Sequence, residues 1–494
     1  MLARLASMRK IIFAFLAYLF VSQAVAAESD GYIHRSAMFR GSFEQLKLPA
    51  NEMMGIVGVN YFVETLPNLY VGGATYGALT GQRGGFFTVG TEVAWHQKLL
   101  QQWGFDTGLY AGGGGGGGAT ALVGGGLMLR PHIDLLWNFA GYRAGLSASQ
   151  VRFPSGEISS KQIGLVFSID EKFSQLNSSR FGEALNSKQR GGVGFDRVHA
   201  VMGVYQGRIF LPQDSKNKIG LVGFRMEQLH TPTNFWGIEA AGEASGGAAG
   251  YAEFLGTAGM ETPVLDGNAT IGARVAAGMG GGGAVSVGGG QLYKVGGYGA
   301  ANINRNTHLA LEGGYVSAPK GQFRARYVAA NLTMDLDHPH SPSEQSRHEQ
   351  YEWLVGTSRY ATAHKDGSVS AMDVVTMHVH HYIGDTIYLS GQAHSAIRGK
   401  DGGYSAGLFG AGFRSAKLYG GISAGVEMLF GAAGGGAVDS SGGAIVSPSV
   451  FVDWELNDLF ALRLSTGRIK SLRGSLNSQT AEAAIKFSYS TTSS

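Results

Sequence analysis

Long segments in which apolar side chains alternate with small or polar ones run through most of this chain. Near residue 60, for example, Val57, Val59 and Tyr61 fall on one face of an extended strand, with small or polar residues on the other. Strict alternation indicates β-strands whose two faces meet different surroundings. The segments cover about ten residues or more, the length of a tilted membrane-spanning strand, whereas strands of soluble proteins average about five to six residues. The sequence therefore predicts an all-β fold with antiparallel strands that cross a membrane.

Glycine-rich runs mark three similar units, and they begin near residues 110, 276 and 430. Each run follows one strand-like segment and precedes three more, so the chain is expected to repeat itself with a period of roughly 150 residues, the size of a small domain. Glycine loses more conformational freedom on folding than any other residue. We therefore expect the runs at hairpin tips outside the membrane, where lost packing costs little.

We expect eight strands in each unit and about 24 in the whole chain. In the first unit the expected strands cover residues 37–46, 53–64, 68–80, 85–97, 104–114, 121–137, 140–153 and 159–170. The three units are expected at residues 28–172, 199–336 and 351–494. Polar segments at 173–198 and 337–350 are expected to link them on the periplasmic side.

The N-terminal residues 1–27 have the pattern of a secretory signal peptide. Arg4, Arg9 and Lys10 precede an apolar run at residues 11–21, and small residues suitable for cleavage follow at 24–27. The apolar run is shorter than the 20 or so residues of a membrane-spanning helix. The pattern predicts export through the inner membrane and cleavage of the signal.

Composition excludes several classes of chemistry. The chain has no Cys, which excludes a disulfide scaffold, a Cys-ligated zinc and a thiol nucleophile. Its net charge of +3 over 494 residues does not indicate nucleic-acid binding. We expect no cofactor.

The turns between expected strands differ on the two sides of the sheet. Connections from even to odd strands are short and polar, and those from odd to even strands carry the glycine runs. Residues 446–469 (VSPSVFVDWELNDLFALRLSTGRI) and 131–146 (PHIDLLWNFAGYRAGL) resemble hairpins of Gram-negative outer-membrane β-barrel proteins. The resemblance implies a porin-like β-barrel in the outer membrane, with the lipid and the barrel-assembly machinery as partners. It also implies a C-terminal aromatic insertion signal, for which Phe487 and Tyr489 are the candidates.

Two closures are compatible with about 24 strands. The chain can form one wide up-and-down barrel, or three tandem eight-stranded barrels whose interiors must be filled by side chains. The expected inward face is rich in small residues, namely Gly72, Ala74, Ala78, Gly90, Gly145 and Ser147. Because such residues would underfill a small barrel, we favour the single barrel, although the long linkers favour three.

Charged and polar residues on the expected inner face are the candidate site, as the lining of a pore. They are Tyr76, Glu92, Arg143, Arg225, Glu243, His394, Arg398 and Lys486. We expect a pore or export channel for an exported or permeating solute. The alternative is a structural or adhesive surface protein without channel activity.

No catalytic or metal site is expected. His378 and His380 share one strand face, but the sequence places no third metal ligand with them. His394 and Ser395 are adjacent in sequence and point to opposite faces of a strand. Pairs of this kind in outer-membrane phospholipases and lipid A deacylases lie two residues apart on one face, so an outer-membrane lipid esterase is a distant third possibility.

Overall fold

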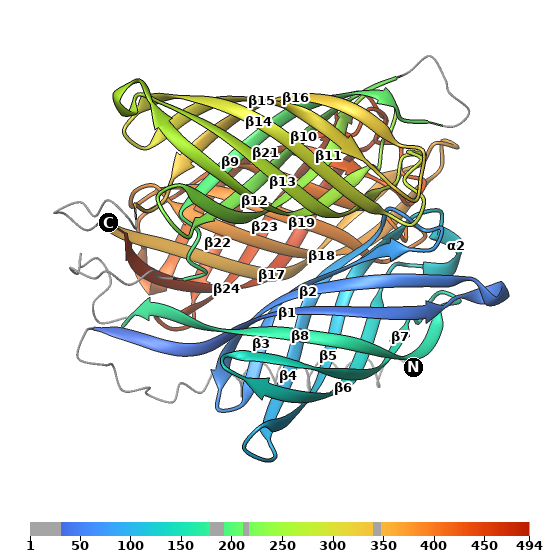
Figure 1. Ribbon diagram of the computed structural model, residues 1–494, viewed down its shortest axis with the longest axis horizontal. Helices are drawn as coiled ribbons and strands as arrows, with labels where there is room; N and C mark the ends of the chain where they lie inside the picture. The colour runs from blue at the N-terminus through green and yellow to red at the C-terminus, as the bar shows by residue number, and fades with distance from the viewer. Residues whose placement is uncertain (1–30, 178–191, 211–216, 339–346, 494) are drawn as a thin grey trace.

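A computed structural model describes residues 31–177, 192–210, 217–338 and 347–493 of the chain. Its sheets are three closed antiparallel barrels of eight strands each (Figure 1). The expected signal peptide, most of the first linker and part of the second lie outside the described residues. Among the described residues, no helix has the length and apolar character needed to span a bilayer.

The three barrels follow one another along the chain and are called barrels 1, 2 and 3. Barrel 1 contains β1 (Tyr32–Lys47), β2 (Met53–Leu66), β3 (Leu69–Thr80), β4 (Phe86–Lys98), β5 (Trp103–Gly116), β6 (Met128–Phe139), β7 (Tyr142–Arg152) and β8 (Ser159–Leu176). Barrel 2 contains β9 (Arg197–Arg208), β10 (Lys218–Leu229), β11 (Asn234–Ser245), β12 (Ala252–Val264), β13 (Ala269–Gly281), β14 (Gln291–Asn304), β15 (Thr307–Ser317) and β16 (Arg324–Asp335). Barrel 3 contains β17 (Arg347–Ala363), β18 (Val369–Tyr382), β19 (Ile387–Arg398), β20 (Ser405–Arg414), β21 (Ile422–Gly434), β22 (Ala444–Glu455), β23 (Phe460–Ser471) and β24 (Asn477–Ser493).

The prediction of a single 24-stranded barrel is wrong. In each unit the first strand pairs with the eighth strand of the same unit, as Phe39↔Ile169 shows for β1 and β8. The pairs Tyr205↔Tyr327 and Val355↔Ile485 close barrels 2 and 3 in the same way. The prediction failed because long charged and aromatic side chains fill the lumens that the glycines and alanines would have left empty.

The prediction for the sixth strand is wrong at its start. Residues 120–123 form the short helix α2 (Thr120–Val123) instead, and β6 begins at Met128. Between them Gly124 and Gly126 have φ values of 56° and 92°. This left-handed backbone suits glycine and interrupts an extended strand.

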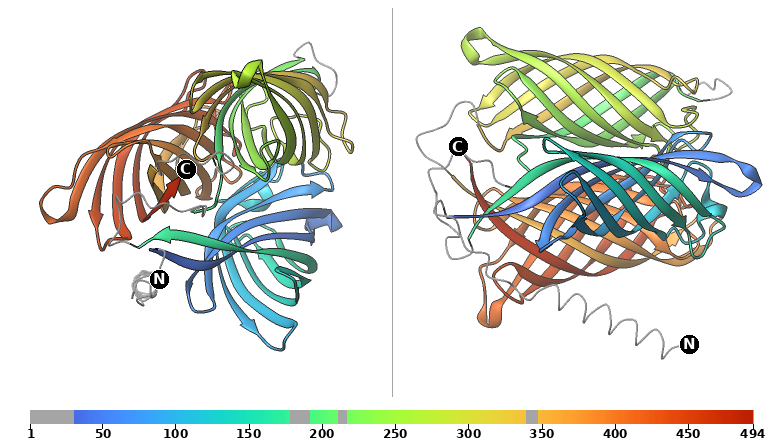
Figure 2. Two further views of the ribbon diagram at one scale, coloured as in Figure 1. Left: turned by 60° about the vertical axis from the view of Figure 1, so that its left-hand side comes forward. Right: turned by 60° about the horizontal axis from the view of Figure 1, so that its bottom comes forward.

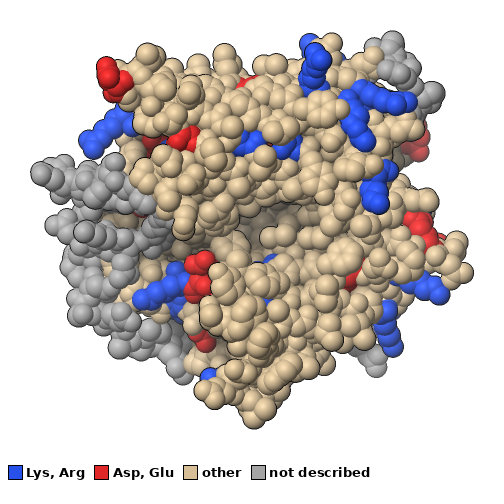
Figure 3. Space-filling model, viewed as in Figure 1, with Lys and Arg blue, Asp and Glu red and all other residues tan. Residues whose placement is uncertain are grey.

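The outward faces of the barrels are apolar and exposed on the sides that face away from the other barrels. Ile163 of β8 is 73% exposed, Leu311 of β15 65% and Val450 of β22 51%. In Figure 3, most charged atoms lie toward the left and right margins of the molecule. The alternation in the sequence therefore corresponds to an apolar outer face and a mostly polar or aromatic inner face.

The three barrels lie at the corners of a triangle (Figure 2, left). Three strand pairs bring them together: β3 of barrel 1 meets β13 of barrel 2, β11 of barrel 2 meets β21 of barrel 3, and β19 of barrel 3 meets β5 of barrel 1. In each of these pairs, one strand is the third strand of its barrel and the other is the fifth strand of its barrel. These three pairs arrange the barrels head to tail in a ring, and a further contact joins β8 of barrel 1 to β24 of barrel 3.

Candidate functional site

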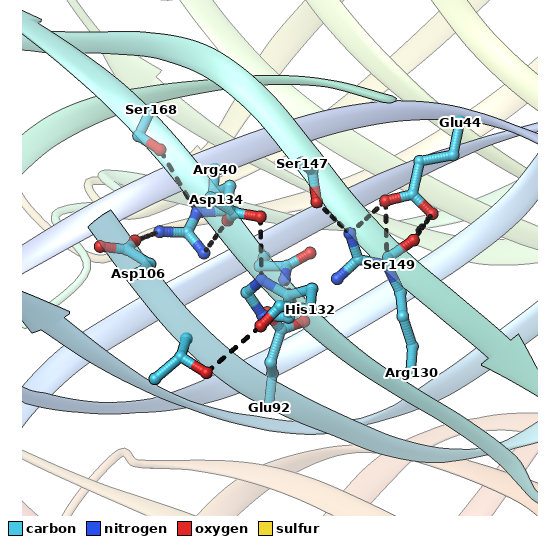
Figure 4. Close-up of polar contacts among 12 residues, drawn as sticks. Arg40, Glu44, Glu92, Asp106, Arg130, His132, Asp134, Ser147, Ser149 and Ser168 are labelled. Atoms are coloured by element: carbon cyan, nitrogen blue, oxygen red, sulfur yellow. Dashed lines mark hydrogen bonds and ion pairs between the residues drawn. The ribbon is translucent and has the colours of Figure 1, made fainter. Parts of the chain in front are cut away.

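The lumen of barrel 1 holds a network of buried ion pairs (Figure 4). The guanidinium of Arg40 pairs with Asp106 and lies 3.2 Å from Asp134. His132 contacts Asp134 at 3.0 Å through Nδ1 and Glu92 at 2.8 Å through Nε2. All five side chains are almost fully buried, and each charge has an opposite partner, without which burial would be very costly.

A second group closes the same lumen nearer the hairpins that precede even-numbered strands. Arg130 pairs with Glu44, and its Nη2 donates to Ser147 at 3.1 Å. Ser149 donates to Glu44 at 2.9 Å. The lumen of barrel 1 is therefore crossed by two arginines in different layers.

The lumen of barrel 2 is filled in the same manner by other residues. Arg274 contacts Glu239 at 2.8 Å and Glu312 at 2.7 Å, and Lys294 contacts Glu239 at 2.6 Å. Arg225 lies 3.0 Å from Glu312. These three cations share a small set of buried carboxylates.

Barrel 3 repeats the arrangement with a further set. Arg463 contacts Asp453 at 2.7 Å, and Lys486 bridges Asp453 at 2.7 Å and Glu352 at 3.0 Å. His380 lies 3.1 Å from Glu352 and 3.3 Å from Glu427. An eight-stranded barrel is just wide enough to be filled by its side chains, and all three lumens are filled here.

Inward-facing glycines make room for these large groups. A Cβ at Gly164 would lie 2.5 Å from Cγ of Glu44, and one at Gly108 would lie 2.5 Å from Nε2 of His132. A Cβ at Gly58 would collide with the ring of Tyr76. The small residues thus complement large residues on neighbouring strands.

Seven of the eight candidate pore-lining residues are buried, and one is not. The buried seven are Tyr76, Glu92, Arg143, Arg225, Glu243, His394 and Lys486. The structure brings Tyr76 and Glu92 together with a 2.8 Å hydrogen bond, and it places Arg225 and Lys486 in the lumens of different barrels. Arg398 has an 81% exposed side chain, 4.0 Å from Asp373 at one end of barrel 3. Their role in lining a pore stays a prediction.

Two histidines of barrel 3, His378 and His380, belong to ion pairs of its lumen. His378 contacts Glu482 at 3.0 Å, and its ring stacks on that of His394 with centroids 6.0 Å apart. Ser395 instead donates to or accepts from Ser405 at 3.0 Å. No cluster of three or more metal-ligating side chains suited to a metal ion occurs in the part of the chain that the structure describes.

The glycine runs lie at the junctions between barrels. The amide of Gly84, in the β3–β4 hairpin of barrel 1, donates to the carbonyl of Gly288, in the β13–β14 hairpin of barrel 2, at 3.0 Å. A Cβ at Gly113 would lie 2.6 Å from the carbonyl oxygens of Ser395 and Ala396, between barrels 1 and 3. At the third junction a Cβ on Gly434 would collide with the backbone of Gly250. The expectation that these runs lie where packing matters little is therefore wrong, because side chains would separate the backbones that meet there.

An acidic side chain ties two hairpins of barrel 3 together at the same end. Asp439 accepts hydrogen bonds from the hydroxyls of Ser441 and Ser475, both at 2.6 Å. These bonds stabilise the carboxylate and lower the pKa of Asp439 to about 2. The hairpin that carries the third glycine run is thus held to its neighbour within the barrel.

A cavity of about 2860 Å³ lies between the three barrels. At the depth of the strands its lining is mostly outward-facing apolar residues, among them Val93 of barrel 1, Ile238 of barrel 2 and Met377 of barrel 3, with a few hydroxyl side chains such as Thr91 and Thr357. The glycine hairpins of all three barrels line one end. Figure 3 shows a hollow in the middle of one face of the molecule.

The opposite end of the cavity is lined by polar and aromatic residues. Arg35, Glu64 and Asp458 lie there, close to the turns that precede odd-numbered strands. Between barrels 1 and 3, Tyr489 packs against Phe173, with ring centroids 5.0 Å apart, and against Trp353 at 5.3 Å. The cavity could not be predicted from the sequence. The signal that could have indicated it is that every unit carries a glycine-rich hairpin, because these hairpins meet where the barrels contact one another.

No protein-family model matches the chain, and no curated protein matches it either. Solved structures similar to it include Pseudomonas aeruginosa OpdK with vanillate, at 8% identity and a TM-score of 0.23, covering 93% of this chain and 98% of that chain. Acinetobacter baumannii OccAB3 has 9% identity and a TM-score of 0.23, covering 93% and 99%. P. aeruginosa OpdQ has 8% identity and a TM-score of 0.21, covering 94% and 100%. Similarity this low carries no functional argument, and the predicted β-barrel class is confirmed by the closed sheets themselves.

Proposed function

We propose that this protein is an outer-membrane pore for apolar or amphipathic molecules, and that its pathway runs between the barrels. The observation that carries the proposal is the inter-barrel cavity of about 2860 Å³ with its apolar lining. The lumens are poor pathways because buried ion pairs such as Arg274–Glu312 cross them. Opening them would leave buried charges without partners.

Membrane residence is supported by the surface and by the closed sheets. Strands can cross hydrocarbon when every backbone polar group is paired, which a closed barrel achieves. The exposed outer faces are apolar over strands of 10 to 18 residues, and strands of about 9–11 residues suffice for a crossing. Recovery of the protein in the outer-membrane fraction, with heat-modifiable gel mobility, is the expected result; recovery as a soluble periplasmic protein contradicts it.

Entry of an apolar dye into whole cells tests the pathway. Cells that express the protein should take up N-phenyl-1-naphthylamine several-fold faster than cells without it. Gly391 and Gly407 line the cavity, and a Cβ at either would meet nothing within 4 Å. The double variant Gly391→Phe, Gly407→Phe should slow entry without unfolding barrel 3.

Gly299→Phe is the matched control, since Gly299 lies on the exposed face of β14 with equal free space. Equal dye entry in all variants would contradict a pathway between the barrels. Planar-bilayer recordings add an independent test, because large ion-conducting steps would place the pathway in the lumens.

The filled lumens also favour a second candidate, a structural or adhesive surface protein without channel activity. This candidate predicts neither dye entry nor ion conductance. The same two measurements therefore separate it from the proposed pore.

A further inference from the structure

We infer that the cavity between the barrels is a binding site for a glycerophospholipid, with the acyl chains among the apolar faces and the headgroup at the end that Arg35 lines. The inference rests on the proposed function, because it presumes a protein embedded in a membrane and names the class of molecule that its cavity takes. The argument uses the lining, the size and the two ends of the cavity.

The lining at the depth of the strands has the chemistry of a lipid-facing surface. Val375, Met377 and Val379 alternate along β18 with the lumen residues Thr376 and His378. They therefore occupy the same outward face that carries apolar residues elsewhere on the barrels. Hydrocarbon is the medium that such a face meets around the outside of the protein, and acyl chains extend that medium into the cavity.

The size and the mostly apolar lining of the cavity favour an occupant other than water. Pockets for small molecules have volumes of about 300–1,000 Å³, so a cavity of about 2860 Å³ is several times larger. Protein interiors are close-packed, and a water needs two to four polar partners to be held well. Phe409, Met428 and Ala432 offer none from their side chains. Flexible acyl chains fill such a space without unmet hydrogen bonds.

The two ends of the cavity give the lipid a direction. At the glycine end, the lining carboxylate Glu243 already accepts the amides of Gly247 and Ala248 at 2.9 and 3.2 Å. At the other end, Arg35 donates to the carbonyls of Glu64 and Thr65, both at 3.3 Å, through a single nitrogen. A guanidinium has five N–H groups and binds phosphate in a forked geometry. The carboxylates of Glu64 and Asp458 line the same end, so the head that fits beside Arg35 carries an ammonium as well as the phosphate.

Site-specific photocrosslinking tests the inference on the full-length protein. The chain has no Cys, so Gly391→Cys and Gly299→Cys can each carry one benzophenone maleimide, in the cavity and on the outer face respectively. The purified proteins are incubated with dioleoylphosphatidylethanolamine, washed with detergent to remove surface lipid, and irradiated. Intact-mass measurement should find the lipid adduct several-fold more often at position 391 than at 299.

The variant Arg35→Gln in the Gly391→Cys background should lower the apparent affinity for the lipid about tenfold, the effect of losing a charge-assisted hydrogen bond. Equal adducts at positions 391 and 299, or none at 391 and at Gly407→Cys as a second cavity position, would overturn the inference. A lipid adduct at 391 in a protein that admits no dye would instead leave the inference standing and contradict the proposed pore.

Discussion

Gly84 and Gly288, 204 positions apart in the chain, are joined by a 3.0 Å hydrogen bond between their backbones. The bond links the β3–β4 hairpin of barrel 1 to the β13–β14 hairpin of barrel 2. A Cβ at Gly84 would lie 2.5 Å from the carbonyl oxygen of Gly288, so the junction requires a glycine for reasons of space.

Substituting Gly84→Val should therefore separate barrels 1 and 2 at this junction. We expect a loss of about 1–3 kcal/mol of unfolding free energy, the usual cost of overpacking, measured by urea unfolding of the protein in detergent. Gly384→Val is the control, because a Cβ at that turn glycine meets nothing within 4 Å. Equal loss in both variants would show that the junction has no special need for glycine.

Removing a lumen cation should destabilise a barrel strongly. Arg274→Met removes the cation that lies 2.8 Å from Glu239 and 2.7 Å from Glu312. The two remaining cations, Lys294 and Arg225, then face the same carboxylates alone, and we expect a loss of about 3–5 kcal/mol. Arg359→Met, at an exposed ion pair with Asp373, should change stability by less than about 1 kcal/mol. A stable Arg274→Met protein with raised ion conductance would instead place the pathway in the lumen.

Cysteine labelling should show which end of the barrels faces outward. A closed antiparallel sheet alternates its hairpins between the two sides, so a Cys replacing Ser155 or Ser441 should react with an impermeant maleimide on intact cells. A Cys at Asn457 should react only after the outer membrane is opened. The opposite labelling pattern would mean that the orientation is inverted.

The contact between the 435–443 and 472–476 hairpins should weaken at low pH, when Asp439 is protonated. The pKa of Asp439 is lowered to about 2 by the hydroxyls of Ser441 and Ser475. The stabilisation of the hairpin contact by the Asp439 carboxylate is therefore fully present above the usual Asp pKa of about 3.9. It is lost as the pH falls through about 2. Cleavage by pepsin at Leu472 should rise near pH 2 in the unmodified protein and should be high at pH 4 in Asp439→Ala.

Cleavage beside Tyr419, which is fully exposed in another turn, provides the internal reference for the activity of pepsin at each pH. If the ratio of the two cleavage rates does not change between pH 4 and pH 1.5, Asp439 does not hold these hairpins together.

The strands themselves could be predicted closely from the sequence. The third strand was expected at 68–80 and is Leu69–Thr80, because its inner and outer faces meet different media and the alternation records this. The start of the sixth strand could not be predicted, since it depends on the left-handed backbone of Gly124 and Gly126.

Closure of the sheets depends on information that the local pattern lacks. Whether β1 pairs with β8 or with a strand of another unit is decided by how the lumen is filled, and there Arg40 reaches across from β1 to Asp106 on β5. Counting inward glycines and alanines underestimates that filling. The contacts between barrels, such as Gly434 against Gly250, join residues of different units, so the alternation within a strand does not record them.

Because one chain contains all three barrels of the ring, each junction between barrels needs little binding affinity of its own. Three separate eight-stranded proteins would fall apart on dilution unless each interface were large and well packed. Here one chain tethers all three, so each contact forms at the high effective concentration that a covalent link provides. Small contact areas between glycine backbones are then enough to keep the barrels together. The stoichiometry of the ring is constant at any expression level, and the three walls of the central cavity can vary independently, as they could not in an assembly of identical subunits.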